Sequence, residues 1–210
     1  MTTQTKHLPV DLKEAEQQLF QTLDKALSDN RYKRISCNLR FEGLRTMPIS
    51  FRLSTFLENN QIPHYLVYSD IGASSLAKKE NPNLASKIYS INEIIRIDIP
   101  RDSLLVAISP KYFDYEEYEK MCLSFNGVII MLNGQLEEPA VGIGSVARSR
   151  RKGFISSWNN IYWVEPIRNG ALMHIYPNDW WLYKLESTGY VYINSFPTRP
   201  NNEQIADNYL

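Results

Sequence analysis

The spacing of apolar and polar residues changes its period once along the chain, near residue 158. Before that point, segments with an apolar residue every three or four positions alternate with short runs that are apolar throughout or strictly alternating. The first pattern is typical of amphipathic helices and the second of strands. We expect helices at residues 11–30, 47–60, 73–80 and 112–125, and strands at residues 34–41, 62–68, 87–91, 95–99, 104–108 and 127–132.

Two of the expected strands are nearly unbroken apolar runs, LLVAI at residues 104–108 and GVIIML at residues 127–132. A strand with one solvated face alternates apolar and polar residues, whereas a strand inside a parallel sheet is buried on both faces. We therefore expect these two strands to be neighbours at the centre of a parallel sheet. The alternation of helices and strands predicts right-handed crossovers between them.

After residue 158 the apolar residues recur at every second position. Strands are expected at residues 161–167, 171–176, 180–185 and 190–196, because short segments with Asn, Pro or Gly separate them. The sequence therefore predicts an α/β fold, a Rossmann-like parallel sheet with helices on both faces, followed by a C-terminal antiparallel β-meander. We expect a single domain over residues 1–210, with the α/β core at 8–152, an aromatic-rich extension at 158–196 and a tail at 197–210 that is only partly ordered.

Two helix starts carry the spacing of a capping box. Asp11 is followed by Glu14, and Asp114 is followed by Glu117. In such a box the first side chain accepts a hydrogen bond from a backbone N–H of the first turn. We expect Asp11 and Asp114 to cap the helices that follow them.

Charge and hydropathy exclude several classes of partner. The chain has 210 residues, of which 23 are basic and 23 acidic. A balanced charge gives no overall field that attracts nucleic acid, so we expect no nucleic-acid partner and only local electrostatic sites. No apolar run approaches the roughly 18 residues of a membrane span, so no transmembrane segment is expected. Cys37 and Cys122 lie in apolar patterns, which predicts small core residues in a reducing compartment.

The carboxyl ends of the expected parallel strands are candidate ligand positions, because open parallel sheets bind ligands there. Asp70, Ser109 and Asn133 each follow one of these strands, and Gly72 lies where the next helix opens. A helix start preceded by glycine presents free N–H groups to an anion. Asp70 has two interpretations, since its carboxylate can contact a ligand or cap the following helix.

A basic segment follows the last expected parallel strand. Gly142 and Gly144 allow a tight turn with accessible N–H groups, and Arg148 and Arg151 add permanent positive charge. An anionic lipid headgroup, a phosphate or an acidic partner loop could dock at this segment. The alternative is a solvated turn that the acidic residues 137–138 partly neutralise.

Aromatic residues are concentrated in the last third of the chain, where Trp180 and Trp181 are adjacent on an expected strand. Adjacent residues of a strand point to opposite faces, so one tryptophan is exposed if the meander has a solvated side. Aromatic residues are enriched in the cores of protein interfaces, which makes Trp180 a candidate partner contact. Ordinary packing of the meander is the alternative.

Catalytic patterns are sparse. His7, His64 and His174 have no nucleophile or metal-ligand spacing beside them, and no Walker A sequence occurs. We therefore assign no catalytic residues, no metal and no cofactor. A non-enzymatic function is favoured, and an enzymatic one stays open.

Four segments together carry a family resemblance: SDIGASSLAKKE, ISPKYFDYEEYEKMC, VIIMLNGQLEEPAVGIGSVARSRRKGF and YPNDWWLYKLESTGYVYINSFPTRP. In this order and spacing they resemble an uncharacterised domain family of cyanobacteria and plastids. This family includes the plastid low-photosystem-II-accumulation factor, and its domain also occurs fused to a plastid adenylate kinase. The resemblance covers residues 8–200. It implies a role in photosystem assembly or maintenance at the thylakoid, and it supplies no catalytic residues.

Two hypotheses about function follow. The first is a non-enzymatic photosystem assembly or maintenance factor that binds a photosystem subunit, an assembly intermediate or the thylakoid surface. Such a protein would be cytoplasmic or stromal and peripheral on the thylakoid membrane. The second is a nucleotide- or phosphometabolite-binding protein that uses Asp70, Ser109 and Asn133. A deep polar cleft at the strand ends would favour the second hypothesis, and a shallow surface with exposed aromatic residues elsewhere the first.

Overall fold

The computed structural model of the protein describes residues 6–137 and 145–209. Contacts between residues divide the chain into two compact units. The strand β1 (Arg34–Leu39) contributes residues to both. The parallel unit consists of Asn30–Cys37 and Arg45–Asn159, and the meander unit of Met1–Asp29, Asn38–Leu44 and Asn160–Leu210.

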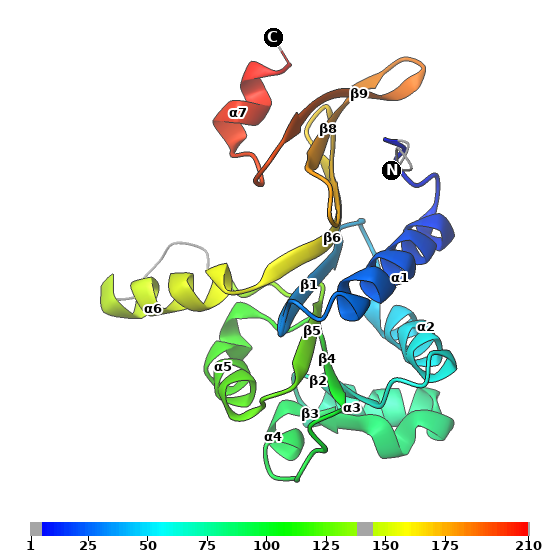
Figure 1. Ribbon diagram of the computed structural model, residues 1–210, viewed down its shortest axis with the longest axis vertical. Helices are drawn as coiled ribbons and strands as arrows, with labels where there is room; N and C mark the ends of the chain where they lie inside the picture. Colours follow the sequence, from blue (N-terminus) through cyan, green and yellow to red (C-terminus); the bar gives the residue numbers. More distant parts are fainter. Residues whose placement is uncertain (1–5, 138–144, 210) are drawn as a thin grey trace. The chain divides into compact units, whose positions relative to one another are not determined.

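The fold is mixed α/β, as the sequence predicts. In the described part of the chain, nine strands form one sheet in the order β3-β2-β4-β5-β1-β6-β7-β8-β9 (Figure 1). The pairs among β1 to β5 are parallel, and those among β6 to β9 are antiparallel. The strands that follow β1 are β2 (His64–Tyr68), β3 (Ile88–Ser90), β4 (Leu104–Ile108), β5 (Val128–Leu132), β6 (Asn159–Ile167), β7 (Gly170–Ile175), β8 (Trp180–Glu186) and β9 (Gly189–Phe196).

The centre of the parallel unit is a pair of strands that are covered on both faces. Every residue of β4 is buried, and so are the last four residues of β5. The two strands pair in parallel along their whole length. The prediction that these apolar runs are neighbouring parallel strands is therefore confirmed.

One face of these strands packs against α4 (Ile91–Ile94), α5 (Tyr115–Ser124) and α6 (Ser145–Ser156). Leu105 of β4 and Ile129 of β5 belong to the hydrophobic cluster on this side. Alternate residues of a strand point to opposite faces, so the residues between them face the other layer.

The second face packs against α2 (Thr46–Asn59), which lies with α3 (Ile71–Glu80) on one side of the parallel strands in Figure 1. Two hydroxyls of α2 bond to β2 side chains. Ser50 Oγ lies 2.7 Å from the hydroxyl oxygen of Tyr68, and Ser54 Oγ lies 2.6 Å from Nε2 of His64. Polar groups buried under a helix thus have partners, which burial requires.

The connections that leave β2 and β4 go in opposite directions along the sheet. The chain passes from β2 through α3 to β3, which is an edge strand, and from β4 through α5 to β5 on the other side. Adjacent strands with diverging connections form a topological switch point, where open α/β sheets bind ligands. In this unit the switch point lies between β2 and β4.

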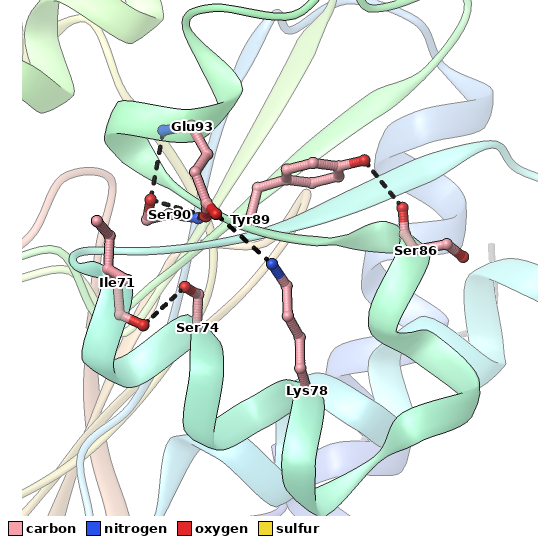
Figure 2. Close-up of polar contacts among 7 residues, drawn as sticks. All are labelled: Ile71, Ser74, Lys78, Ser86, Tyr89, Ser90 and Glu93. Carbon is pink, nitrogen blue, oxygen red and sulfur yellow. Dashed lines mark hydrogen bonds and ion pairs between the residues drawn. The ribbon is translucent and has the colours of Figure 1, made fainter.

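A capping box lies just before residues 95–99, where the sequence suggested a further strand. The hydroxyl of Ser90, the last residue of β3, accepts a hydrogen bond from the N–H of Glu93, and the Glu93 carboxylate accepts one from the N–H of Ser90 at 2.7 Å (Figure 2). The prediction of a strand at residues 95–99 is wrong. The box starts α4 directly after β3, and Lys78 of α3 lies 3.6 Å from the Glu93 carboxylate.

The meander unit has its own apolar core. Trp163, Leu172, Trp180 and Leu182 form its buried cluster, and Ile205 from α7 (Asn202–Asp207) packs against it. This helix lies within the segment that the sequence analysis treats as a tail. The side chain of Asn201 caps α7, so the helix start has a hydrogen-bond partner as well as an apolar contact.

The long first helix of this unit, α1 (Leu12–Ser28), begins as predicted. The carboxylate of Asp11 accepts a hydrogen bond from the N–H of Glu14 at 2.8 Å, and the Glu14 carboxylate accepts one from the N–H of Val10 at 2.7 Å. One backbone donor of the first turn and one just before the cap are therefore satisfied.

Both cysteines are buried free thiols, as expected for small core residues. Cys37 lies in β1 and Cys122 in α5. Burial raises the pKa of both thiols, to about 12 for Cys122. Neither side chain has the exposed thiolate character that a reactive cysteine needs.

Candidate functional site

The carboxyl ends of β2, β4 and β5 carry a group of polar side chains, which we call the strand-end site. They come from the starts of α2 and α3 and from the loops that follow β4 and β5, all in the parallel unit. The site includes three of the residues singled out from the sequence. Its members are Thr46, Asp70, Ser109, Lys111, Asp114, Asn133 and Gln135.

Both central strands end in a residue with left-handed backbone. Ser109 follows β4 with a φ of 50°, and Asn133 follows β5 with a φ of 54°. The N–H of Ser109 donates to the carbonyl of Leu132, and that of Asn133 to the carbonyl of Cys37, both at 2.8 Å. Asn tolerates left-handed backbone better than most residues, whereas at Ser109 this conformation costs about 1–2 kcal/mol, and such strain is concentrated at functional sites.

Hydrogen bonds join the loops at this edge to each other. The hydroxyl of Ser109 lies 2.8 Å from Oγ1 of Thr46, the first residue of α2. Nζ of Lys111 donates to Oε1 of Gln135 at 2.6 Å, and the N–H of Gln135 donates to the carbonyl of Pro110 at 2.8 Å. Hydrogen bonds therefore tie together the loops and the start of α2 that carry the hydroxyl, ammonium and amide groups.

Asp114 has a different role from the one predicted. A 3-10 turn, η2 (Tyr112–Asp114), precedes α5, and the Asp114 side chain makes no capping bond to that helix. Its carboxylate accepts a hydrogen bond from the N–H of Lys111 at 2.9 Å instead. Asp114 does occupy the N-cap position of α5, but the 3-10 turn gives it a φ of −90° and a ψ of 3° in place of extended backbone, and its carboxylate is used within that turn. The prediction that it caps the helix is therefore wrong.

The carboxylates of Asp70 and Asp114 bring negative charge to the switch point. Burial raises the pKa of the Asp114 carboxyl; the Lys111 hydrogen bond opposes that rise, and the carboxylates of Asp70 and Glu117 add to it. Asp70 at the end of β2 and Asp114 after β4 therefore lie close enough for their carboxylates to repel each other. A group that donates hydrogen bonds is therefore better suited to this point than a further anion.

Asp70 acts as a helix cap. Its Oδ1 accepts a hydrogen bond from the N–H of Ala73 at 2.8 Å, which confirms that interpretation. The same oxygen limits position 72, because a Cβ added to Gly72 would lie 3.1 Å from it. The first turn of α3 thus already holds a carboxylate, and this leaves less capacity for an external anion.

Exposed apolar side chains project from the same edge, and we call them the apolar rim. Its members are Ile71, Tyr112 and Phe113, whose residues are 61%, 39% and 68% exposed. Ile71 starts α3, where it is labelled in Figure 2, and the two aromatic residues form the turn after β4. The Tyr112 and Phe113 rings meet edge to face with centroids 5.2 Å apart. Clustered exposed apolar groups mark interaction surfaces.

Sequence reasoning missed the apolar rim. The available signal was a pair of adjacent aromatic residues between a strand end and the apolar stripe of the next helix. On α5 that stripe begins only at Tyr115, so neither Tyr112 nor Phe113 has a place in the core. The helix expected over residues 112–125 had included both in one regular element.

The basic segment forms the helix α6, and a carboxylate of α5 forms an ion pair with one of its arginines. The guanidinium of Arg150 binds the buried carboxylate of Glu119, with Nη2 2.5 Å from Oε2. The hydroxyl of Tyr115 donates to the same carboxylate at 2.9 Å. Arg151 lies over the ring of Tyr115 at 4.2 Å, and Arg148 is exposed.

Glu119 is the acidic partner that sequence reasoning did not find. It lies four residues after Tyr115, on the buried side of α5, so a carboxylate on an otherwise apolar stripe was the available signal. The other candidates of this segment, Gly142 and Gly144, lie outside the described residues, and so does Glu138.

Trp180 is a core residue of the meander unit. Trp180 and Trp181 are 5% and 3% exposed, so both faces of β8 are covered at this point, as the alternative of ordinary packing predicts. The ring of His174 stacks on Trp180 with centroids 4.9 Å apart, and His174 Nε2 lies 2.8 Å from the carbonyl oxygen of Asn160. Trp180 therefore offers no exposed surface to a partner.

The histidines in the cores make structural hydrogen bonds. Besides its bond to Ser54, His64 has Nδ1 2.9 Å from the carbonyl oxygen of Ile62. Burial lowers the pKa of His64 and of His174. Both rings are thereby favoured in the neutral form near pH 7.

The described ranges, 6–137 and 145–209, contain neither a cluster of metal-ligating side chains nor a membrane-spanning helix. Their His, Cys, Asp and Glu side chains include no group of three or more that could hold a metal ion. None of their helices is both long enough and apolar enough to span a membrane.

Comparison with known families gives one finding. The family described as "Domain of unknown function (DUF1995)" matches residues 9–207, which is nearly the whole chain. The comparison with curated proteins found no match.

The bond between α6 and α5 leads to a stability prediction. Arg150→Ala would leave the Glu119 carboxylate, 6% exposed, without its charged partner. We expect the free energy of unfolding in urea to fall by about 1–3 kcal/mol, because the buried carboxylate would lose its charged partner and keep only the Tyr115 hydroxyl. Lys152→Ala, on the exposed side of the same helix, should change it by less than about 0.5 kcal/mol. Equal effects of the two substitutions would contradict the assignment.

Proposed function

The chain belongs to the DUF1995 family, and from this premise we propose that it is a non-enzymatic assembly or maintenance factor for a photosystem. The proposal assigns the contact with a photosystem subunit or assembly intermediate to the apolar rim beside the strand-end site. The observation that carries it is the exposure of Phe113, at 68%, whose ring meets that of Tyr112 at the strand-end edge where Ile71 is also exposed.

The energetics favour a protein partner at this edge. Removing a large apolar side chain such as Phe113 or Ile71 from water contributes about 1.5–3 kcal/mol. The polar groups of the strand-end site, with Lys111 and Asp114 as opposite charges, can orient the partner but contribute less affinity. A partner segment that inserts an apolar side chain and presents hydrogen-bond donors to the Asp70–Asp114 side fits both features.

The family resemblance supports the photosystem as the target. Three of the segments that carry it supply the residues of this edge. SDIGASSLAKKE contains Asp70 and Ile71, ISPKYFDYEEYEKMC contains Ser109 and Phe113, and the run VIIMLNG ends beside Asn133. Segments that resemble a photosystem assembly factor therefore converge on one surface of the fold.

A peripheral position on the thylakoid surface belongs to the same proposal. Arg148 and Lys152 are exposed and four residues apart on α6, so they lie on one side of the helix. Exposed basic residues contribute about 1 kcal/mol each to binding an anionic membrane surface, and salt screens this attraction. The helix would then act as a membrane contact, and the apolar rim as the protein contact.

The apolar rim leads to a direct binding test. Phe113→Ser should reduce the capture of photosystem subunits from a thylakoid-containing lysate by about tenfold or more, because an apolar anchor is lost. The readout is quantitative mass spectrometry of the captured proteins. Leu123→Ser, which alters a residue with 62% exposure on α5, is the matched control and should capture as the unchanged protein does.

Unchanged capture by Phe113→Ser, with the thermal stability preserved, would remove the apolar rim from the account. Capture that carries no photosystem subunit from any variant would contradict the proposed target.

Binding of a nucleotide or phosphorylated metabolite at the strand-end site is the second candidate function. The topological switch point between β2 and β4 favours it, because Lys111 and the left-handed Ser109 lie there. The carboxylates of Asp70 and Asp114 at the same point oppose it. We therefore rank it below the protein contact.

A thermal-shift screen with nucleotides and sugar phosphates separates the two candidates. If the second holds, a ligand at a hundred times its dissociation constant adds about 2.7 kcal/mol to stability. That shift should disappear in Lys111→Gln and persist in Lys120→Gln, an exposed lysine on α5. If no compound of the screen stabilises the unchanged protein, the second candidate is contradicted and the first is unaffected.

A further inference from the structure

Strand β9 is an edge of the sheet and belongs to the meander unit. It is eight residues long and pairs with β8 in an antiparallel ladder. Beyond that ladder, no backbone hydrogen bond joins β9 to another residue that the structure describes. The outer side of an edge strand presents N–H and C=O groups that can pair with another chain.

The two halves of β9 differ in how well they are protected. In the second half the register shifts so that Ile193 has no partner on β8, and the N–H of Ser195 donates to the Asn194 side chain at 2.8 Å. A bulge distorts the edge, and an N–H that already donates to a side chain cannot donate to another strand. Both features discourage pairing with a further chain. The first half, residues 189–192, pairs with β8 in regular register. The open part of the edge is therefore at residues 189–192.

Composition gives this open part no protection either. The strand GYVYINSF contains no charged residue and no proline, although natural edges usually carry Lys or Pro. Tyr190 is 48% exposed and Val191 40%. Leu185 of β8, 52% exposed, lies directly opposite Tyr190 in the ladder. Exposed β-prone residues thus coincide with open backbone groups.

We propose that β9 pairs antiparallel with β9 of a second copy of the chain, around a twofold axis at Val191. This inference concerns the meander unit and does not rest on the proposed function. A twofold axis perpendicular to the sheet keeps the faces of both copies aligned, so facing residues must have the same parity. Val191 then faces its own copy, and Tyr190 faces Tyr192 of the second copy.

The side chains at this seam suit a second copy. Aromatic pairs and pairs of β-branched residues are favourable neighbours across antiparallel strands. Self-pairing would set like charges against each other if the strand carried any, and it carries none. Lys6 lies over the Tyr192 ring at 3.8 Å, and the Tyr183 ring meets it edge to face with centroids 6.0 Å apart, so contacts within the meander unit already position this ring. Charge and side-chain type therefore both permit this self-complementary contact.

Sedimentation velocity of the full chain at about 1 to 200 µM tests the proposal, because a dimer fraction must rise with concentration. We expect a concentration-dependent dimer in the unchanged protein. Val191→Lys should raise its dissociation constant by at least about tenfold, since two ammonium groups would face each other. Leu185→Lys adds the same charge to the same hairpin on the inner strand, and should change it by less than about threefold.

A mixture of charge variants tests the register. Val191→Lys and Val191→Glu should each be monomeric alone, whereas an equimolar mixture should restore the dimer because opposite charges then meet at the axis. A chain that stays monomeric at every concentration would overturn the proposal and leave the edge for an extended segment of another protein. A dimer that Val191→Lys leaves unchanged, or a mixture that stays monomeric, would also overturn it.

Discussion

Two-sided burial of the central parallel strands is the constraint on which the rest of the parallel unit depends. A buried strand must satisfy its backbone N–H and C=O groups in the ladder, because no water reaches them. β4 meets this requirement by pairing with β2 on one side and β5 on the other. Its side chains then need an apolar layer on each face, which α2 provides on one side and α4, α5 and α6 provide on the other.

The same constraint determines where chemistry can be exposed. Polar side chains cannot stay unpaired inside the layers, so they appear with partners, as at His64 and Ser54, or at the strand ends. At the strand ends the chain has to leave the sheet abruptly, and Ser109 and Asn133 adopt left-handed backbone to do so. The hydroxyl, ammonium and carboxylate groups of the strand-end site meet for this reason. The apolar rim is exposed because its residues lie outside both layers.

The balance of charges at this edge decides between the two candidate functions. Free N–H groups at a helix start attract anions, but the first turn of α3 already has a carboxylate from Asp70. Asp114 adds a second carboxylate nearby, and Lys111 is bonded to Gln135. A partner protein that buries Phe113 does not have to overcome this repulsion. The apolar contact is therefore the stronger of the two interpretations.

The sequence was sufficient for features that depend on local pattern. The runs at residues 104–108 and 127–132 identified the central strands, and Asp11 identified the start of α1, because periodicity and capping act over a few neighbouring residues. It was insufficient where tertiary packing selects between local options. Asp114 has the spacing of a cap but bonds to Lys111, and residues 95–99 look like a strand but follow a capping box.

The candidate site was predicted only in part, for a related physical reason. Strand ends follow from the strand pattern, so Asp70, Ser109 and Asn133 could be named in advance. The exposure of a side chain depends on which residues the helical layers cover, and a local sequence pattern does not predict that coverage. Phe113 was therefore missed, whereas Trp180, which the composition favoured, is covered on the inside of the meander unit. The partner of Arg150 was missed because Glu119 lies 31 residues away in the chain.

The claim that the apolar rim is the partner contact is tested most directly by photo-crosslinking from that surface. A photoreactive phenylalanine analogue at position 113, in the full chain, would be compared with the same analogue at position 123, which is similarly exposed on α5. After irradiation in a thylakoid-containing lysate, the account predicts crosslinks from position 113 to a photosystem subunit and none from position 123. Crosslinks to that subunit from position 123 alone, or equally from both positions, would contradict it.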